Sequence, residues 1–476
     1  MPTVLAGRGE TSVRGPATWA GRVQDRLIEA ADEQTVRAQQ EHIRQYLKQH
    51  GVTFEGKRID VSFMPTIVSA DEVARVSAQG RLIRSALEKV IAAFRRELRR
   101  NPCEGPLQRA FRPYRKWFGL ITRERPLADE IGLMRFDCIR PRPGRWTFIE
   151  TNTACAGGTT TCPILRRAWL TSPLGKHALR GARLKQHPQD RQEAFVEFLL
   201  RRARQVGGPG AGNVAALNHC GDLTFEMDLW EHVAHRLRKR GQTQGKLLLG
   251  DIREVEVRKG AAYLRGVPIA LFHNKVDPLG IDPEDPSIQD WIAASRLSSA
   301  DFLNSFGAKF LTEAKRVLVL LQQPEMQDAI GLDPAERQAA AEMLPPCAIV
   351  RASDAEQRAR LHRHRRRLVL KADALTRGKG VFMGNELDPR GWDEAIDVTH
   401  KNFGVVQQRI PIPLSPAIDF RRGHIGLGQE HYGIELFYLG GRFGGIASRS
   451  HRNQVFNVGV GGKERAALAV ARWMED

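Results

Sequence analysis

Two short apolar segments of the sequence each carry a pair of polar residues spaced two positions apart. Arg135 and Asp137 lie in GLMRFDCIR, and Glu150 and Asn152 lie in RWTFIETN. In a β-strand, residues i and i+2 point to the same face, so each pair would project together. A carboxylate and an amide oxygen are ligands that magnesium accepts when phosphates and water complete its coordination. We therefore predict a magnesium site at Glu150 and Asn152, with an exposed edge strand as the alternative interpretation.

A second segment, LVLKADALTRGKGVFMG, combines strand-like apolar runs with lysines and glycines. Lys371 ends the first apolar run, and Gly378, Lys379 and Gly380 precede the next one. Glycine lets the backbone approach a phosphate closely, and a lysine at a strand end offers a compact cation for the phosphate oxygens. The pattern predicts phosphate binding. A hairpin with an exposed basic tip is the alternative interpretation.

A third segment, GGRFGGIASRSHRNQVFNVGVGG, places an arginine between two glycine-rich stretches. Arg449 has the planar fork that binds carboxylates well, and the loop at 458–462, which includes Gly461 and Gly462, could close over a substrate. A β-hairpin whose glycines only make turns is the alternative.

Strands and helices must position these residues. GLMRFDCIR and RWTFIETN flank a PRPG turn, which predicts two adjacent strands. Residues 20–50 and 71–100 have helical periodicity, the second helix with Asp71 as its N-cap. Strands and helices alternate after residue 207, which favours a parallel sheet, and a further helical stretch is expected from residue 301 to residue 321.

The pattern predicts that the chain divides into four ranges. They are a helical N-terminal region at 1–125, a strand region with the metal and substrate motif at 126–206, an α/β substrate domain at 207–300, and a nucleotide-binding domain with a glycine-rich loop at 301–476. The fold class expected from these ranges is α+β and multi-domain.

Composition limits the classes of protein. The 476 residues are 42% hydrophobic and 27% charged, which is ordinary for a folded globular protein. No run of apolar residues is long enough to span a membrane and the first residues do not resemble a secretory signal, so we expect no membrane partner and a cytoplasmic location. The six cysteines include no CxxC pair, so neither a zinc knuckle nor a disulfide framework is indicated.

The net charge of +19 favours anionic partners. It keeps a nucleic-acid-binding protein as a rival hypothesis, supported by HRHRRR at 362–367. No aromatic RNA-binding motif or paired zinc signature accompanies this cluster, so a solvated turn is the preferred interpretation.

Three motifs in this order resemble those of the eukaryotic-type glutathione synthetases, a family of circularly permuted ATP-grasp ligases. IETNTACAGG resembles the family's EINTxxxSxGG, VVQQRIPIP resembles its segment ending in MExIEPxP, and HYGIELFYL with FGGIASRS and NVGVGG resembles its strand, hairpin and lid. The resemblance runs from near Asp71 to Gly462 and implies an ATP-grasp fold.

The resemblance also implies roles for residues of this chain. Glu150 and Asn152 would hold magnesium, and Arg135, Asp137, Arg449, Gly461 and Gly462 would contact the substrate, the two arginines with a catalytic role. ATP would be bound by Lys315, Lys371, Gly378, Lys379, Gly380, Gln407, Gln408, Arg409 and Glu430. The family has a third metal ligand, a glutamate, about four residues after the phosphate-loop lysine, and in this chain the only acid nearby is Asp373.

The activity implied is ATP- and Mg²⁺-dependent joining of a carboxylate to an amine through an acyl phosphate, on amino acid or small peptide substrates. The lid has glycines where the family has alanines, and nothing matches its cysteinyl-peptide pocket, so glutathione is not expected as the product. A degenerate ligase fold acting as a scaffold or binding subunit is an alternative, and the family is often dimeric, so a homodimer stays open.

Overall fold

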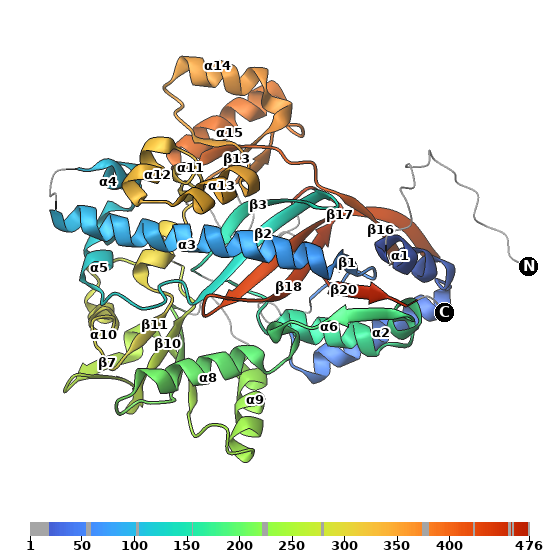
Figure 1. The fold of residues 1–476 in the computed structure, drawn as a ribbon, viewed down its shortest axis with the longest axis horizontal. Helices are drawn as coiled ribbons and strands as arrows, with labels where there is room; N and C mark the ends of the chain where they lie inside the picture. The colour runs from blue at the N-terminus through green and yellow to red at the C-terminus, as the bar shows by residue number, and fades with distance from the viewer. Residues whose placement is uncertain are drawn as a thin grey trace, which may run out of the picture.

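The computed structural model describes residues 19–53, 59–100, 104–154, 156–220, 227–277, 280–373, 380–421, 424–455, 458 and 461–474. Within these ranges the strands form five sheets. In Figure 1 one long helix, α3, runs across the middle of the molecule.

The central sheet joins strands that are far apart in the sequence. Its order is β19-β18-β17-β2-β3, and β16 pairs with β17. The strands are β2 (Leu133–Arg142), β3 (Arg145–Asn152), β16 (Leu414–Arg421), β17 (His424–Leu439), β18 (Arg442–His451) and β19 (Lys463–Arg465). All neighbours are antiparallel, which confirms the predicted pairing of GLMRFDCIR with RWTFIETN. Because β2 pairs with β17, the ranges expected at 126–206 and 301–476 contribute to one sheet.

A parallel sheet follows residue 207, as the alternation of strands and helices predicted. Its order is β11-β10-β5-β6. The strands are β5 (Val214–Asn218), β6 (Leu247–Asp251), β10 (Leu271–Asn274) and β11 (Asp301–Leu303), with helices α8 (Ala194–Val206) and α9 (Met227–Lys239). Beside them lie β7 (Val255–Arg258), β8 (Ala261–Leu264), β9 (Val267–Ile269) and α10 (Gln289–Ala294).

The prediction that a helix begins at residue 301 is wrong. Residues 301–303 form strand β11, because the buried Phe302 and Leu303 complete the parallel sheet beside β10. Helical structure begins only afterwards, with the π-helical turn η6 (Ala308–Thr312) and α11 (Val317–Leu320).

The C-terminal half contains a smaller antiparallel sheet of order β12-β15-β13-β14. Its strands are β12 (Cys347–Ile349), β13 (Leu368–Lys371), β14 (Val381–Met383) and β15 (Val405–Gln408). Helices α14 (Ala355–Arg363) and α15 (Pro389–Lys401) pack on it through a separate core that includes Leu361, Leu370, Trp392 and Val406. This unit lies at the top of Figure 1.

Helix α3 (Ala70–Arg100) packs against the central sheet with the apolar face that its periodicity predicted, and Val76, Ile83, Val90 and Phe94 are buried. The prediction of Asp71 as N-cap is wrong. The helix begins at Ala70, and the Asp71 N–H is bound by Ser69 Oγ at 3.3 Å.

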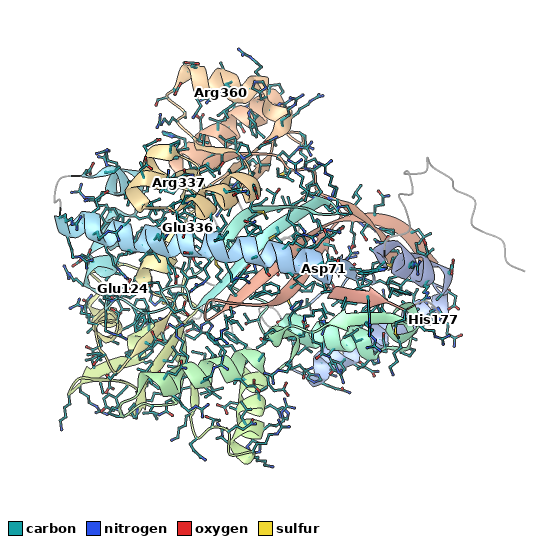
Figure 2. The ribbon with its side chains drawn as sticks, in the orientation of Figure 1. Asp71, Glu124, His177, Glu336, Arg337 and Arg360 are labelled. Carbon is teal, nitrogen blue, oxygen red and sulfur yellow. The ribbon has the colours of Figure 1, made fainter. Side chains whose placement is uncertain are left out.

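Shorter helices surround α3. These are α4 (Pro106–Ala110), the 3₁₀ turn η1 (Arg112–Trp117), α5 (Phe118–Arg123), α12 (Pro324–Ile330) and α13 (Pro334–Met343). Lys89 Nζ on α3 lies 2.6 Å from Glu336 Oε2 on α13, where Figure 2 shows the two helices side by side.

The two ends of the described chain lie together at one side of the molecule (Figure 1). The helix expected over 20–50 is two helices, α1 (Trp19–Glu29) and α2 (Glu33–Gln49), because Asp32 caps the second by accepting the Thr35 N–H. Strand β20 (Ala467–Trp473) pairs with β1 (Thr66–Ser69) and β4 (Ala182–Lys185), near α6 (Thr161–Thr171) and α7 (Pro173–Ala178). No helix within the described ranges has the length and apolar character needed to cross a membrane.

Candidate active site

One face of the central sheet carries the polar residues singled out in the first two strands. The register places Arg135 opposite Asn152 and Asp137 opposite Glu150. The other face is apolar there, and the rings of Phe136 and Phe148 stack with their centroids 4.5 Å apart. Phe148 and Glu150 are two residues apart, and a register shift that pairs Phe148 with Cys138 moves Phe148 to the face of Phe136. This shift separates the charged face from the core.

The smaller sheet meets this charged face through Lys371 and Gln407. Lys371 Nζ donates a hydrogen bond to the carbonyl oxygen of Ile149 at 2.7 Å, and Gln407 Nε2 donates to the same oxygen at 3.3 Å. Lys315, which follows η6, places its Nζ 3.5 Å from Glu150 Oε1. Three distant segments thus bring Lys315, Lys371 and Glu150 together.

The charges of this group depend on one another. Burial raises the pKa of Glu150, but the positive charges of Lys315, Lys371 and Arg135 outweigh it and leave that pKa below its usual value. Burial likewise lowers the pKa of Lys315, but Glu150, Asp373 and Glu313 more than compensate and raise it. For Lys371 burial dominates, and its pKa is lowered. The group therefore contains a stabilised carboxylate beside amines suited to phosphate oxygens.

The residues near Lys371 fit a magnesium ion in part. Glu150 offers a carboxylate. The amide nitrogen of Asn152 donates a hydrogen bond to Asp137 Oδ1 at 2.9 Å, so the amide oxygen of Asn152 takes no part in that bond. Two hard oxygen ligands are enough for Mg²⁺ when phosphates and water supply the others.

Asp373 does not fit as the third ligand, because both of its oxygens have partners. Oδ1 accepts the backbone N–H of Lys315 at 2.7 Å. Oδ2 accepts the hydroxyl of Tyr114 and lies 3.5 Å from Arg316 Nε. Asp373 therefore connects the helical N-terminal region to the segment before α11, a role that the sequence did not indicate.

Arg135 and Arg449 already have carboxylate partners within the chain. Arg135 Nε donates to Asp137 Oδ1 at 2.7 Å and lies 3.5 Å from Glu435 Oε1. Arg449 lies 3.1 Å from Glu435 Oε1 through its NH1 and 3.3 Å from Glu464 Oε1 through its Nε. The structure places the two arginines in one network, in which both face carboxylates of this chain.

Glu435 and Glu464 are the site residues that sequence reasoning missed. Glu435 lies beside Asp137 on the next strand, and burial raises its pKa to about 7 although Arg135 and Arg449 act against this. The available signal was an acid in the apolar strand HYGIELFYL, since buried strands seldom hold an isolated charge.

The other predicted ATP contacts are spread more widely. Gln408 is exposed, and Arg409 binds the backbone oxygen of Arg366 at 3.1 Å. Glu430 is buried, and its carboxylate accepts hydrogen bonds from Lys463 Nζ at 2.6 Å and from two serine hydroxyls. These described partners do not include Lys371. Gly380 accepts the Ala372 N–H with its carbonyl oxygen at 2.8 Å.

The glycine-rich segments are described only in part. Gly378 and Lys379 lie outside the described residues. Gly461 adopts a φ of 92°, and Gly461 and Gly462 lead directly into β19 and its Glu464.

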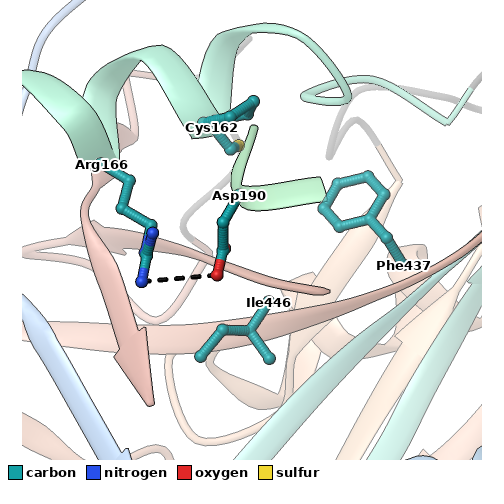
Figure 3. Close-up of a pocket in the computed structure, with 6 residues that line it drawn as sticks. Cys162, Arg166, Asp190, Phe437 and Ile446 are labelled. Carbon is teal, nitrogen blue, oxygen red and sulfur yellow. Dashed lines mark ion pairs between the residues drawn. The ribbon is translucent and has the colours of Figure 1, made fainter. Parts of the chain in front are cut away.

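Figure 3 shows a small pocket of about 10 Å³. It is lined by Cys162, Pro163, Arg166, Asp190, Phe437 and Ile446. Arg166 and Asp190 form an ion pair at 3.4 Å, and Cys162 Sγ lies 3.9 Å from Glu464 Oε2. This volume has room for about one water molecule.

The fold is α+β, multi-domain and ATP-grasp-like, as the sequence predicted. A solved structure similar to this chain is a glutathione synthetase-like effector from Globodera pallida in its apo form. The TM-score is 0.59 at 12% identity, covering 92% of this chain and 98% of that one. D-alanyl-alanine synthetase A from Vibrio cholerae matches with a TM-score of 0.28 at 11% identity, covering 46% of this chain and 67% of that one. No family model and no curated protein matches the sequence. At 12% identity the first likeness establishes the fold alone.

Proposed function

We propose that this protein is an ATP- and Mg²⁺-dependent carboxylate–amine ligase that forms an amide on an amino acid or small peptide. The observation that carries the proposal is the meeting of Glu150, Lys315 and Lys371 from three segments, with Lys315 Nζ 3.5 Å from Glu150 Oε1. The ATP-grasp-like fold and the order of the sequence motifs support it.

The chemistry requires neutralisation of negative charge. A carboxylate is a poor acyl donor, and transfer of the ATP γ-phosphoryl group to it would give an acyl phosphate that an amine can attack, releasing phosphate. Lys315 and Lys371 would hold phosphate oxygens and balance the charge that develops during transfer, usually the largest catalytic contribution in such reactions. Glu150 and Asn152 would hold Mg²⁺, which when bound adds positive charge at the same oxygens.

The substitution Lys371→Met tests the proposal. Loss of one charged donor from a water-excluded site costs about 3 kcal/mol, so ADP formation stimulated by amino acids or dipeptides should fall by about a hundredfold. Lys401→Met, at an exposed lysine that ends α15, is the matched control and should retain the full rate. Undiminished ADP formation by a folded Lys371→Met protein would contradict the proposal.

A nucleotide-binding scaffold without turnover is the second candidate, because Asp373 is bonded to Tyr114 and Lys315 instead of facing a metal. Such a protein would bind ATP and release no ADP with any amine tested. A screen of ADP release across amino acids, dipeptides and amines, with mass analysis of the products, separates the two candidates.

A further inference from the structure

Two neighbouring parallel strands, β5 and β6, end beside each other and bring a nitrogen, a sulfur and an oxygen donor together. The last residues of these strands, Asn218 and Asp251, are opposite each other in the register. His219 and Cys220 follow Asn218 directly. Ligands of open α/β sheets bind at the carboxyl ends of the parallel strands. The three donors therefore lie at the edge of the sheet where binding residues are usually found.

The distances between the donors are close to those of a metal site. One donor atom from each of His219, Cys220 and Asp251 lies within 4.8 Å of the other two. His219 Nδ1 is 3.9 Å from Cys220 Sγ and 3.9 Å from Asp251 Oδ1. Two ligand atoms bound to one tetrahedral zinc ion lie about 3.3–3.6 Å apart. Because Cys220 is exposed and His219 is half-buried, small side-chain rotations are enough to reach that spacing.

The backbone holds Cys220 against the end of β6. Cys220 has a φ of 51°, in the left-handed region that residues other than glycine seldom adopt. In this conformation its N–H donates a hydrogen bond to Asp251 Oδ2 at 2.7 Å. Hydrogen bonds of this kind orient carboxylates that bind metal ions. The turn after β5 thus places the thiol and the carboxylate side by side.

Arg253 is the group that neutralises Asp251 in this structure. Arg253 Nε donates to Oδ1 at 2.8 Å, and its NH2 donates to Oδ2 at 3.0 Å. The Arg253 side chain is 45% exposed, and an exposed ion pair contributes little to stability. A divalent cation on Oδ1 can therefore replace this guanidinium, while the backbone N–H groups of Cys220 and Arg253 keep the carboxylate in place. Asp285 interacts electrostatically with His219 and Arg253, and it adds a second negative charge that favours a cation.

The types of donor select the metal. Imidazole, thiolate and carboxylate are all ligands of zinc, whereas magnesium and calcium prefer oxygen ligands alone. We propose that His219, Cys220 and Asp251 form a Zn²⁺ site at the carboxyl ends of β5 and β6, with a fourth position open to water. The Cys220 thiol releases its proton to solvent when the metal binds. The site shares no residue with the group around Glu150, so the proposal does not depend on the ligase function.

The first test is competition for Zn²⁺ between the reduced full chain, freed of metal with a chelator, and a chromophoric zinc indicator. The unaltered protein should take one Zn²⁺ per chain from the indicator. Cys220→Ser and Asp251→Asn should each weaken Zn²⁺ binding by about a hundredfold or more, because losing a ligand costs more than the 10–100-fold of losing a group that only orients one. His177→Ala, at an exposed histidine on α7, is the matched control and should bind Zn²⁺ as the unaltered protein does. Zn²⁺ affinity that neither Cys220→Ser nor Asp251→Asn changes would overturn the proposal.

Co²⁺ in place of Zn²⁺ shows directly whether sulfur is a ligand. A thiolate ligand gives Co²⁺ a charge-transfer absorption in the near ultraviolet. This absorption should be present in the unaltered protein and in His177→Ala, and absent in Cys220→Ser. Because Cys220 is exposed, its replacement by serine leaves the core intact. Absorption that persists in Cys220→Ser would overturn the assignment of Cys220 as a ligand.

The substitution Arg253→Ala tests the role of Asp251 by a gain of affinity, which a folding defect cannot imitate. Removing the competing guanidinium should tighten Zn²⁺ binding several-fold. Arg258→Ala, at an exposed arginine on β7 that lies 3.9 Å from Glu256, is the matched control and should leave the Zn²⁺ affinity unchanged. Equal Zn²⁺ affinity in Arg253→Ala and in the unaltered protein would overturn the assignment of Asp251 as a ligand.

Discussion

Glu435 lies between Arg135 and Arg449, and its burial affects stability. Burial raises the pKa of Glu435 from 4.5 to about 7. The folded protein therefore holds this proton more tightly than the unfolded chain does between these pH values. The stability contribution is complete below pH 4.5 and is lost as the pH rises through about 7. The difference is on the order of 3 kcal/mol.

The substitution Glu435→Gln should remove this pH dependence, because the amide cannot titrate. Urea unfolding at several pH values between about 5 and 8 checks it, as the difference in unfolding free energy between the two proteins. The unaltered protein should lose stability relative to Glu435→Gln as the pH rises. A constant difference over that range would show that Glu435 has the same pKa in the folded and unfolded states.

At the residue scale, the sequence indicated which neighbouring side chains share one face of a strand, but not which distant residues they contact. Alternation in two strands was enough to place Arg135 with Asp137 and Glu150 with Asn152. The partners of the arginines could not be found in this way. Glu435 comes from a strand about three hundred residues later, and only the pairing of β17 with β2 brings it beside Asp137.

At the element scale, Gly80 sets how closely α3 approaches the central sheet. A Cβ atom on Gly80 would lie 2.1 Å from Tyr438 Oη and 2.9 Å from its Cζ atom. Tyr438 is fully buried, and its hydroxyl donates to the Ser77 carbonyl oxygen at 2.9 Å, so the ring has little room to move. In a helix alanine is favoured over glycine by about 1 kcal/mol, but overpacking a core costs about 1–3 kcal/mol.

Gly80→Ala should therefore lower the unfolding free energy by up to about 2 kcal/mol, measured by urea unfolding. Gly119→Ala in α5 is the matched control. The added Cβ atom would meet no atom closer than 3.7 Å, so only helix propensity acts, and stability should rise by up to about 1 kcal/mol. A gain in stability from Gly80→Ala would show that α3 and Tyr438 can separate without cost.

The same elements show where prediction from sequence ends. Hydrophobic periodicity located α3, the β2–β3 pair and the alternating strands and helices after residue 207, because burial on one face produces that pattern. It did not locate β11, since three buried residues are too few for any period to be visible. It also could not show that packing requires glycine at residue 80. The atoms that a Cβ atom there would meet belong to Tyr438, on a strand far away in the sequence.

At the scale of the whole molecule, Asp373 connects three regions. Its carboxylate accepts the Tyr114 hydroxyl from η1 and the Lys315 N–H, and it lies near Arg316, while the residue itself follows β13. Arg316 extends the connection, since its guanidinium donates to the carbonyl oxygens of Ala110 and Phe403 at 2.6 Å each. The family resemblance offered Asp373 as a metal ligand because it is the only acid near Lys371. Its long-range contacts give it different partners.

Asp373→Ala separates these two roles. A buried carboxylate with a cationic partner costs about 3 kcal/mol or more to remove, because Arg316 and Tyr114 lose their acceptor. Urea unfolding without Mg²⁺ or nucleotide should show this loss. Asp354→Ala, which removes the N-cap of α14, is the matched control and should cost about 1 kcal/mol.

If Asp373→Ala were as stable as the unaltered protein but bound labelled ATP with altered Mg²⁺ dependence, the carboxylate would belong to the metal site. A stability loss with unchanged Mg²⁺ dependence would establish Asp373 as the residue that holds the helical region against the sheet formed by β12, β15, β13 and β14.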